Sequence, residues 1–254
     1  SSCGGGDSDA DARTNAGSRR EALSALVPVG SIPPDAHTKG MWSPVKPWPL
    51  IAVHAVVLPD GRLLTYGTDL AGKQTGYFDY DVWDPAGGLD GGHLTLPNET
   101  QTDIFCSASL VLPQGDAVVM TGGDNWTGSG TTNTGNDNSN IFFPANNTLT
   151  RANNMNRARW YASAITLLNG ESYIQGGTGG TDLPEVRKAD GTFRLLTGAD
   201  TSFAGYSYPR NFIAPDGRVF GFDMNGRMYY VDPTGSGSLT RAGEFRSVSS
   251  GSDA

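Results

Sequence analysis

One pattern recurs four times along this chain: an apolar run, a tight turn that contains Gly, and a second apolar run. The turns read Asp-Gly, Gln-Gly or Asn-Gly, and Gly provides the positive φ that a tight β-hairpin needs. Successive turn glycines are 54, 55 and 47 residues apart. A repeat of this length constrains the fold strongly, because each unit must pack on its neighbours. The hairpin segments are 55–67, 110–123, 165–177 and 212–221, with turn glycines Gly61, Gly115, Gly170 and Gly217.

A second apolar stretch follows three of the hairpins, at 80–85, 140–144 and 228–233, and each ends near its own turn residues. In the third repeat the weaker segment 185–191 takes this place. Two hairpins in a period of about 50 residues are typical of one kelch-type propeller blade. We therefore predict an all-β fold, a kelch-type β-propeller with about four four-stranded blades between residues 42 and 243.

The composition agrees with many short strands and argues against two kinds of partner. Gly contributes 35 residues, whereas charged residues make up only 17% of the chain, which favours tight turns over long charged helices. The net charge of -8 offers no broad cationic surface for a phosphate backbone, so we expect no nucleic-acid partner. No apolar run reaches the roughly 18 to 20 residues that cross a bilayer, so we expect no transmembrane segment.

The two ends of the chain differ from the repeats. Small and polar residues predominate at 1–41 and 244–254, and we expect a disordered leader and a flexible tail there. Ser1-Ser2-Cys3, followed by glycines, resembles the lipidation site of bacterial lipoproteins. We therefore expect an extracytoplasmic protein, secreted or anchored at the bacterial cell surface through a lipid on Cys3. A disordered leader with an incidental cysteine is the alternative interpretation.

The number of visible repeats bears on whether the ring closes. Kelch propellers usually close with six or seven blades, because each blade buries its two faces on its neighbours. Four repeats therefore favour a portion of a longer, seven-bladed propeller. A compact ring of four blades is the alternative.

Three chemically notable residues share one position in the repeat. Cys106, Tyr161 and Tyr208 each lie nine residues before a turn Gly, and Ala52 holds this place in the first copy. Equivalent positions in adjacent blades lie at similar depth along the central channel, so we expect Cys106 and Tyr161 to face each other across one blade boundary. The alternative interpretation of Cys106 is a small buried apolar residue.

At these positions the chain resembles the galactose oxidase and glyoxal oxidase family of radical-copper oxidases, which are secreted seven-bladed kelch-like propellers. Phe105-Cys106-Ser107, followed by Thr121-Gly122-Gly123, is similar to the family's cysteine strand. Arg159-Trp160-Tyr161, followed by Gly176-Gly177, is similar to its copper-tyrosine strand and is closer to the glyoxal oxidase branch. The resemblance runs from about residue 42 to residue 243.

The resemblance implies a catalytic pair and a metal. Cys106 would form a thioether with the ring of Tyr161, whose phenolate would be a ligand of one copper ion. A copper ion and a tyrosyl radical would together oxidise a primary alcohol or aldehyde to an aldehyde or acid, while dioxygen is reduced to hydrogen peroxide. Arg210 and Tyr208 would lie near the channel mouth and bind the substrate; a surface position for Arg210 is the alternative.

The chain departs from the family's pattern at two points. Its histidines, His37, His54 and His93, form no metal-ligand pattern, so we expect structural or surface positions for them and further copper ligands outside these 254 residues. The galactose oxidase branch stacks a tryptophan on its cross-linked tyrosine, but the corresponding loop here reads Thr178-Gly179-Gly180. We expect Trp160 to point away from Tyr161, because neighbouring strand residues face opposite sides.

Two further expectations concern packing. The polar segment 128–140 is expected to be a long flexible loop between strands. Aromatic residues of the outer strands are expected to pack between blades, namely Trp83, Phe142, Phe143, Tyr229 and Tyr230.

A second functional class fits the same repeats. A non-catalytic kelch propeller that binds a protein or a glycan at the cell surface would also need four-stranded blades, and it would retain Cys106 and Tyr161 as packing residues. Copper binding and a cross-link between the two residues distinguish the oxidase from this alternative.

Overall fold

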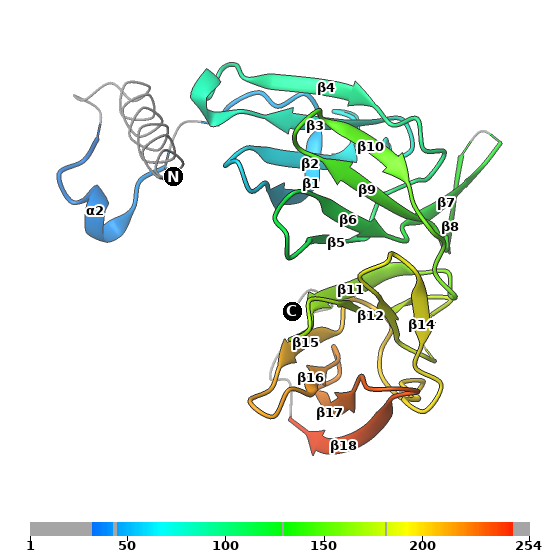
Figure 1. The fold of residues 1–254 in the computed structure, drawn as a ribbon. Coiled ribbons are helices and arrows are strands. Elements are labelled where there is room, and N and C mark those ends of the chain that lie inside the picture. Colours follow the sequence, from blue (N-terminus) through cyan, green and yellow to red (C-terminus); the bar gives the residue numbers. More distant parts are fainter. Residues whose placement is uncertain (1–31, 43–44, 129, 181, 246–254) are drawn as a thin grey trace, which may run out of the picture.

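The computed structural model describes residues 32–42, 45–128, 130–180 and 182–245, and within them β-strands dominate (Figure 1). The helical elements in these ranges are α2 (Ala36–Lys39) and the 3-10 turn η2 (Pro85–Gly87). No helix in the described ranges is long and apolar enough to span a membrane. Cys3 and most of the expected leader lie outside the described residues.

Sixteen of the strands form four antiparallel sheets of four strands each. The first sheet contains β1 (Ile51–Val57), β2 (Leu63–Thr68), β3 (Asp79–Trp83) and β4 (His93–Pro97). The second contains β5 (Ala108–Val111), β6 (Val118–Thr121), β9 (Ser139–Phe143) and β10 (Thr148–Arg151). The third contains β11 (Trp160–Thr166), β12 (Ser172–Thr178), β13 (Glu185–Arg187) and β14 (Phe193–Leu195). The fourth contains β15 (Arg210–Ile213), β16 (Val219–Phe222), β17 (Arg227–Asp232) and β18 (Ser238–Glu244).

The four sheets are the blades of a propeller-like, all-β fold, as the repeat predicts. Figure 1 shows them following one another in chain order around an arc. The innermost strands contact each other in sequence, since β5 contacts β1 and β11, and β11 contacts β15. The predicted turns form as well: the φ angles of the four turn glycines are 89°, 71°, 82° and 86°.

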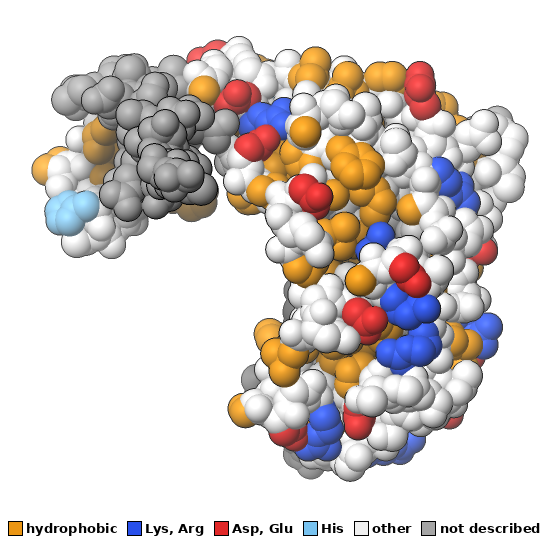
Figure 2. Space-filling model, in the orientation of Figure 1, with side chains coloured by type: hydrophobic (Ala, Val, Ile, Leu, Met, Phe, Trp, Pro, Cys, Tyr) orange, Lys and Arg blue, Asp and Glu red, His pale blue; other side chains and the backbone are white. Residues whose placement is uncertain are grey.

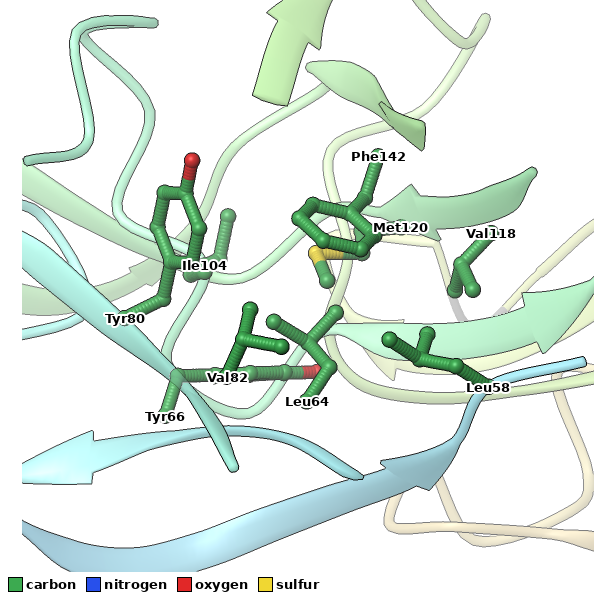
Figure 3. Close-up of a cluster of buried hydrophobic side chains, with 9 residues drawn as sticks. All are labelled: Leu58, Leu64, Tyr66, Tyr80, Val82, Ile104, Val118, Met120 and Phe142. Atoms are coloured by element: carbon green, nitrogen blue, oxygen red, sulfur yellow. The ribbon is translucent and has the colours of Figure 1, made fainter. Parts of the chain in front are cut away.

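Each of the first three blades carries a cross-strand pair at one equivalent position, between the second and third strands of its sheet. In the first three blades these pairs are Leu64 with Val82, Val119 with Ile141, and Tyr173 with Val186. All six side chains are buried. Figure 3 shows the first boundary, where side chains from the first two blades form one apolar cluster. At this boundary the apolar stretches of the repeat therefore form the contact between blades.

In the fourth blade the equivalent pair consists of two aromatic residues. Phe220 pairs with Tyr230, their ring centroids are 5.2 Å apart, and both are half-buried. Phe212, on the same sheet, is 54% exposed and stacks on Phe222. Figure 2 shows hydrophobic side chains along the concave side of the arc formed by the sheets. The outer face of the fourth blade thus has the apolar character that the inner blades bury.

Segment 128–140 corrects one expectation. Instead of a long flexible loop, it contributes to a hairpin of β7 (Asp124–Thr127) and β8 (Gly130–Gly135), placed between β6 and β9. The Asp124 carboxylate accepts hydrogen bonds from the backbone N–H groups of Asn125 and Thr134. The ring of Trp126 stacks on Tyr77 at 5.3 Å. These contacts order a segment whose polar composition carries no strand signal.

The expectation that all five outer-strand aromatic residues pack between blades is wrong in part. Phe142 and Tyr229 are fully buried in two different apolar clusters. Phe143, next to Phe142 on β9, is 38% exposed, because adjacent strand residues face opposite sides. Trp83 and Tyr230 are half-buried on the outer faces of the first and fourth blades.

Truncation of adjacent residues on β9 tests the boundary between the first two blades. We expect Phe142→Ala to lower the free energy of unfolding by about 3–5 kcal/mol, because it opens a cavity in a fully buried cluster. Phe143→Ala is the matched control and should cost less than about 1 kcal/mol. Urea unfolding of both variants measures the difference, and equal costs would contradict the assignment of this boundary.

Candidate functional site

The inner end of each of the last three blades has an unusual backbone conformation. Cys106, Tyr161 and Tyr208, the residues nine before the turn glycines, have φ angles of 58°, 71° and 42°. A positive φ is uncommon for residues other than Gly and costs free energy. Three consecutive blades have a positive φ at the same repeat position. This position is therefore a candidate functional site.

Hydrogen bonds link these residues from blade to blade. The backbone N–H of Tyr161 donates to the carbonyl oxygen of Cys106 at 3.1 Å, and that of Tyr208 donates to the carbonyl oxygen of Tyr161 at 2.8 Å. The N–H of Cys106 donates to Nε2 of His54 at 3.0 Å. The first blade thus provides a ring nitrogen where later blades provide a carbonyl. We call these three bonds the inter-blade ladder.

The ladder brings three reactive side chains together. The buried thiol of Cys106 lies close enough to the phenols of Tyr161 and Tyr208 that each phenol affects the pKa of the thiol. The two phenol rings meet edge to face, with centroids 5.3 Å apart. The structure therefore places Cys106 and Tyr161 in contact across one blade boundary, and it adds Tyr208 from the next blade.

Trp160 differs from expectation. Its ring centroid lies 4.2 Å from that of Tyr161 with 34° between the planes, so it covers Tyr161 instead of pointing away. Neighbouring side chains alternate only along extended backbone, and the positive φ of Tyr161 interrupts that conformation. The ring contact is therefore a consequence of the same unusual backbone.

Burial keeps the three groups protonated at neutral pH. It raises the pKa of the Cys106 thiol to about 11, and the two neighbouring phenols only partly offset this effect. Burial, together with the neighbouring thiol, raises the pKa of Tyr161 to about 12 and raises that of Tyr208 further. A neutral thiol is a poor nucleophile. The arrangement therefore suits oxidation in which electrons and protons leave together.

Two buried carboxyl groups, those of Asp103 and Asp124, lie close enough to this cluster to affect the pKa of Cys106. The side-chain amide of Asn136 donates to the backbone carbonyl oxygens of Asp103 and Asp124, at 3.1 and 2.6 Å. Burial raises the pKa of Asp103 to about 6 and that of Asp124 above its usual range. Sequence reasoning missed this pair; Asp103 and Asp124 flank the Cys106 segment and the double Gly, but nothing in the repeat marks them.

Arg159 fixes the backbone directly before Trp160 and Tyr161. Its guanidinium is fully buried and donates from Nε and Nη2 to Oε1 of Glu185, at 3.0 and 2.9 Å. Nη1 also donates to the carbonyl oxygens of Gly176 and Gly180, both at 2.8 Å. One side chain therefore joins the start of β11 to β13 and to the loop after the double Gly.

The double glycines allow the blades to approach closely at this end. A Cβ atom on Gly122 would lie 2.1 Å from the carbonyl oxygen of Arg159, and one on Gly123 would lie 2.0 Å from that of Asp103. Both glycines also have positive φ. The Gly-Gly pair therefore has a steric reason, which is the close passage of neighbouring inner strands.

The two residues expected to bind substrate are placed as follows. Tyr208 lies against the thiol, and Arg210 begins β15 with its Nη1 donating to the Tyr208 carbonyl oxygen at 2.5 Å. Both are half-buried. Their part in substrate binding stays a prediction.

The described residues do not by themselves fit a complete copper site. Tyr161 offers one oxygen ligand, and in the described ranges no group of three or more His, Cys, Asp or Glu residues could hold a metal ion. Nε2 of His54 accepts a backbone hydrogen bond, and Nδ1 of His93 pairs with Asp81 at 2.7 Å. These two histidines therefore have structural positions.

Comparison with known proteins supports the fold. No protein-family model and no curated protein matches the chain. Among solved structures it is similar to one described as a novel fungal alcohol oxidase with catalytic diversity among the AA5 family, in complex with copper. The TM-score is 0.63 and the identity 23%, over 80% of this chain and 44% of that one. The chain thus spans less than half the length of that oxidase, and at this identity the similarity shows the fold.

Removal of the buried guanidinium tests its structural importance. We expect Arg159→Ala to lower the free energy of unfolding by about 3–5 kcal/mol, because the Glu185 carboxylate would stay buried without its cationic partner. The matched control is Arg157→Ala, which breaks the exposed pair with Asp182 and should cost less than about 1 kcal/mol. Similar urea denaturation curves for the two variants would contradict this account.

The ladder predicts that folding stability depends on pH through His54. Burial lowers the pKa of His54 to about 4 from 6.5, so at pH values between these two the unfolded chain binds a proton that the folded chain does not. Stability due to His54 is therefore complete above pH 6.5 and is lost as the pH falls towards 4. His54→Gln keeps an acceptor for the Cys106 N–H but does not titrate.

The stability of the wild-type chain relative to His54→Gln should accordingly fall between pH 6.5 and 4 and be constant above pH 7. Asp103 acts in the opposite direction, because its pKa is raised to about 6, but it is present in both proteins and cancels in the difference. Urea unfolding across this pH range measures the effect. A difference that does not change with pH would show that His54 is not held neutral in the folded chain.

Proposed function

We propose that this chain is the part of a copper-radical oxidase that carries the redox-active tyrosine. The enzyme would oxidise a primary alcohol or an aldehyde to an aldehyde or an acid and reduce dioxygen to hydrogen peroxide. The observation that carries the proposal is the 3.1 Å hydrogen bond from the Tyr161 N–H to the Cys106 carbonyl oxygen, which brings the thiol and the phenol together at the inner ends of neighbouring blades. The similarity in fold to a copper alcohol oxidase supports it.

Copper would supply a one-electron couple beside the phenol, and Tyr161 is the ligand that this chain offers. Under the proposal the remaining ligands come from a part of the protein outside these 254 residues, within a seven-bladed kelch-type ring. The aromatic outer face of the fourth blade, centred on Phe220 and Tyr230, fits such an arrangement, because a further blade would bury it as the inner boundaries are buried.

Thioether formation accounts for the residues that the ladder gathers. The S–H bond of Cys106 and one C–H bond of the Tyr161 ring break, and a carbon–sulfur bond forms. Two protons and two electrons leave, and dioxygen accepts them to give hydrogen peroxide. A sulfur substituent donates electron density to the ring and makes the phenol easier to oxidise. Trp160, packed on Tyr161, would keep water from the oxidised ring.

The proposal extends to substrate and location. Arg210, at the start of β15, would bind an oxygen-rich alcohol or aldehyde through its guanidinium, and Tyr208 lies beside it. Cys3 would carry a lipid anchor, or the protein would be secreted. An extracytoplasmic location agrees with a reaction that consumes dioxygen and releases peroxide.

Copper loading tests the proposal on this chain. In a Cys3→Ser background, Cys106 is the only cysteine. We expect incubation with Cu²⁺ in air to lower the intact mass by two hydrogens and to remove the titratable thiol, and we expect no mass loss in the Cys106→Ala control. An unchanged mass with a free thiol, in this chain and in the full gene product, would favour a non-catalytic propeller that binds a protein or glycan.

A further inference from the structure

Two residues of the first blade hold three consecutive residues at the start of the second. His54 on β1 and Tyr66 on β2 are cross-strand partners, and their rings stack with centroids 4.9 Å apart and 18° between the planes. The ring of Phe105 meets the His54 ring edge to face at 5.9 Å. Nε2 of His54 accepts the hydrogen bond from the Cys106 N–H at 3.0 Å. The hydroxyl groups of Tyr66 and Ser107 share a hydrogen bond of 2.9 Å. The segment that carries the thiol is therefore fixed from the first blade at three successive positions.

His54 takes the place that a backbone carbonyl takes in the later blades. The N–H groups of Tyr161 and Tyr208 each donate to a carbonyl oxygen of the preceding blade. In the first blade Ala52 holds the repeat position, and there the register of β1 with β2 is irregular, since it shifts between Ile51 and His54. A ring nitrogen two residues further along β1 is the acceptor instead.

The bond is well placed to control the backbone of Cys106. A neutral imidazole accepts at one nitrogen and donates at the other, so acceptance at Nε2 places the ring proton on Nδ1. Cys106 is only 4% exposed, and Tyr66, on which the imidazole stacks, is fully buried. A buried N–H that loses its acceptor is costly. The acceptor on His54 therefore bears directly on the conformation that Cys106 adopts.

We propose that His54 is a positioning residue for Cys106, whose Nε2 holds the Cys106 N–H and thereby keeps the thiol presented to the ring of Tyr161. This inference rests on the proposed function, because the reaction that it assists is thioether formation. His54 acts through the backbone of Cys106 and has no part in binding copper or substrate.

The hydrogen bond assists a defined step. As the carbon–sulfur bond forms, Cys106 loses the hydrogen of its thiol and Tyr161 loses a ring hydrogen, while dioxygen accepts the two electrons and two protons. The φ of 58° at Cys106 turns its side chain away from the direction that an extended strand would give it. This conformation costs free energy in a residue other than Gly, and the bond to His54 offsets part of that cost. The reacting atoms thus stay together before oxidation begins. His54 is neither oxidised nor consumed.

Two substitutions separate the acceptor of His54 from its ring. His54→Phe keeps a flat ring against Tyr66 and removes the acceptor, whereas His54→Gln removes the ring and keeps an acceptor. Val186→Ala is the control for a general loss of stability. Val186 is fully buried in the apolar cluster of the third and fourth blades, which contains neither His54 nor Cys106.

Three readouts in the Cys3→Ser background test the inference. The first is the rate at which the intact mass falls by two hydrogens after Cu²⁺ is added in air. The second is the hydrogen-exchange rate of the Cys106 amide in the metal-free protein, followed by NMR. The third is the coupling across the hydrogen bond between the Cys106 amide nitrogen and Nε2 of His54, measured in the ¹⁵N-labelled, metal-free parent at neutral pH.

We expect His54→Phe to slow the mass change and to speed exchange of the Cys106 amide, each about tenfold, which is the effect of one lost hydrogen bond. His54→Gln should keep both rates within about threefold of those of the parent, because the bond is retained. Val186→Ala should keep the rate of the mass change within about twofold, because the two sites are separate. The parent should show the coupling.

An unchanged rate of mass change in His54→Phe, with normal cross-linking in the parent, would overturn the inference and leave the proposed function intact. Equal slowing in His54→Phe and His54→Gln would also overturn it, because the acceptor would then not be the feature that matters. The same holds for equal slowing in Val186→Ala. If His54→Phe does not fold, the parent decides: absence of the coupling overturns the inference, and its presence with a near-parental rate in His54→Gln supports it.

A parent protein that does not cross-link would instead count against the proposed function. In that case the two NMR readouts decide whether His54 holds Cys106. The coupling together with faster exchange in His54→Phe supports the contact, and absence of the coupling or unchanged exchange overturns it.

Discussion

The hydrogen bond from the Tyr161 N–H to the Cys106 carbonyl oxygen is the contact on which the site depends. It ties the inner end of one blade to that of the next, and both residues have a positive φ. That conformation turns the side chains of Cys106 and Tyr161 towards one another, and its repetition at Tyr208 adds a second phenol.

The surrounding residues stabilise the positive φ conformation of the ladder residues. Gly122 and Gly123 have no side chain where the next blade passes, and a Cβ atom on either would collide with a neighbouring carbonyl oxygen. Arg159 is buried with five hydrogen bonds from its guanidinium, two of them to Glu185. A buried cation is retained only when it is fully paired. The positive φ angles and the buried cation therefore lower stability at the inner ends of the blades. Backbone strain of this kind commonly accompanies function.

The sequence predicted those features that follow from periodicity. Turn glycines at regular intervals predicted the hairpins, and apolar runs between them predicted the blades, because period and turn chemistry are local properties. The shared register also predicted that Cys106 and Tyr161 would lie near each other. Features that depend on one unusual φ could not be predicted: the Trp160 ring lies on Tyr161 because the strand is not extended there. The hairpin of β7 and β8 was missed because tertiary contacts order a polar segment.

The central claim is that backbone hydrogen bonds between blades hold Cys106, Tyr161 and Tyr208 together. Hydrogen exchange of the Tyr161 and Tyr208 amides, followed by NMR, tests it most directly. Our account predicts exchange as slow as that of the buried strand amides of β12, because both N–H groups are bonded across a blade boundary. Exchange as fast as that of the exposed residue Glu99 would contradict it.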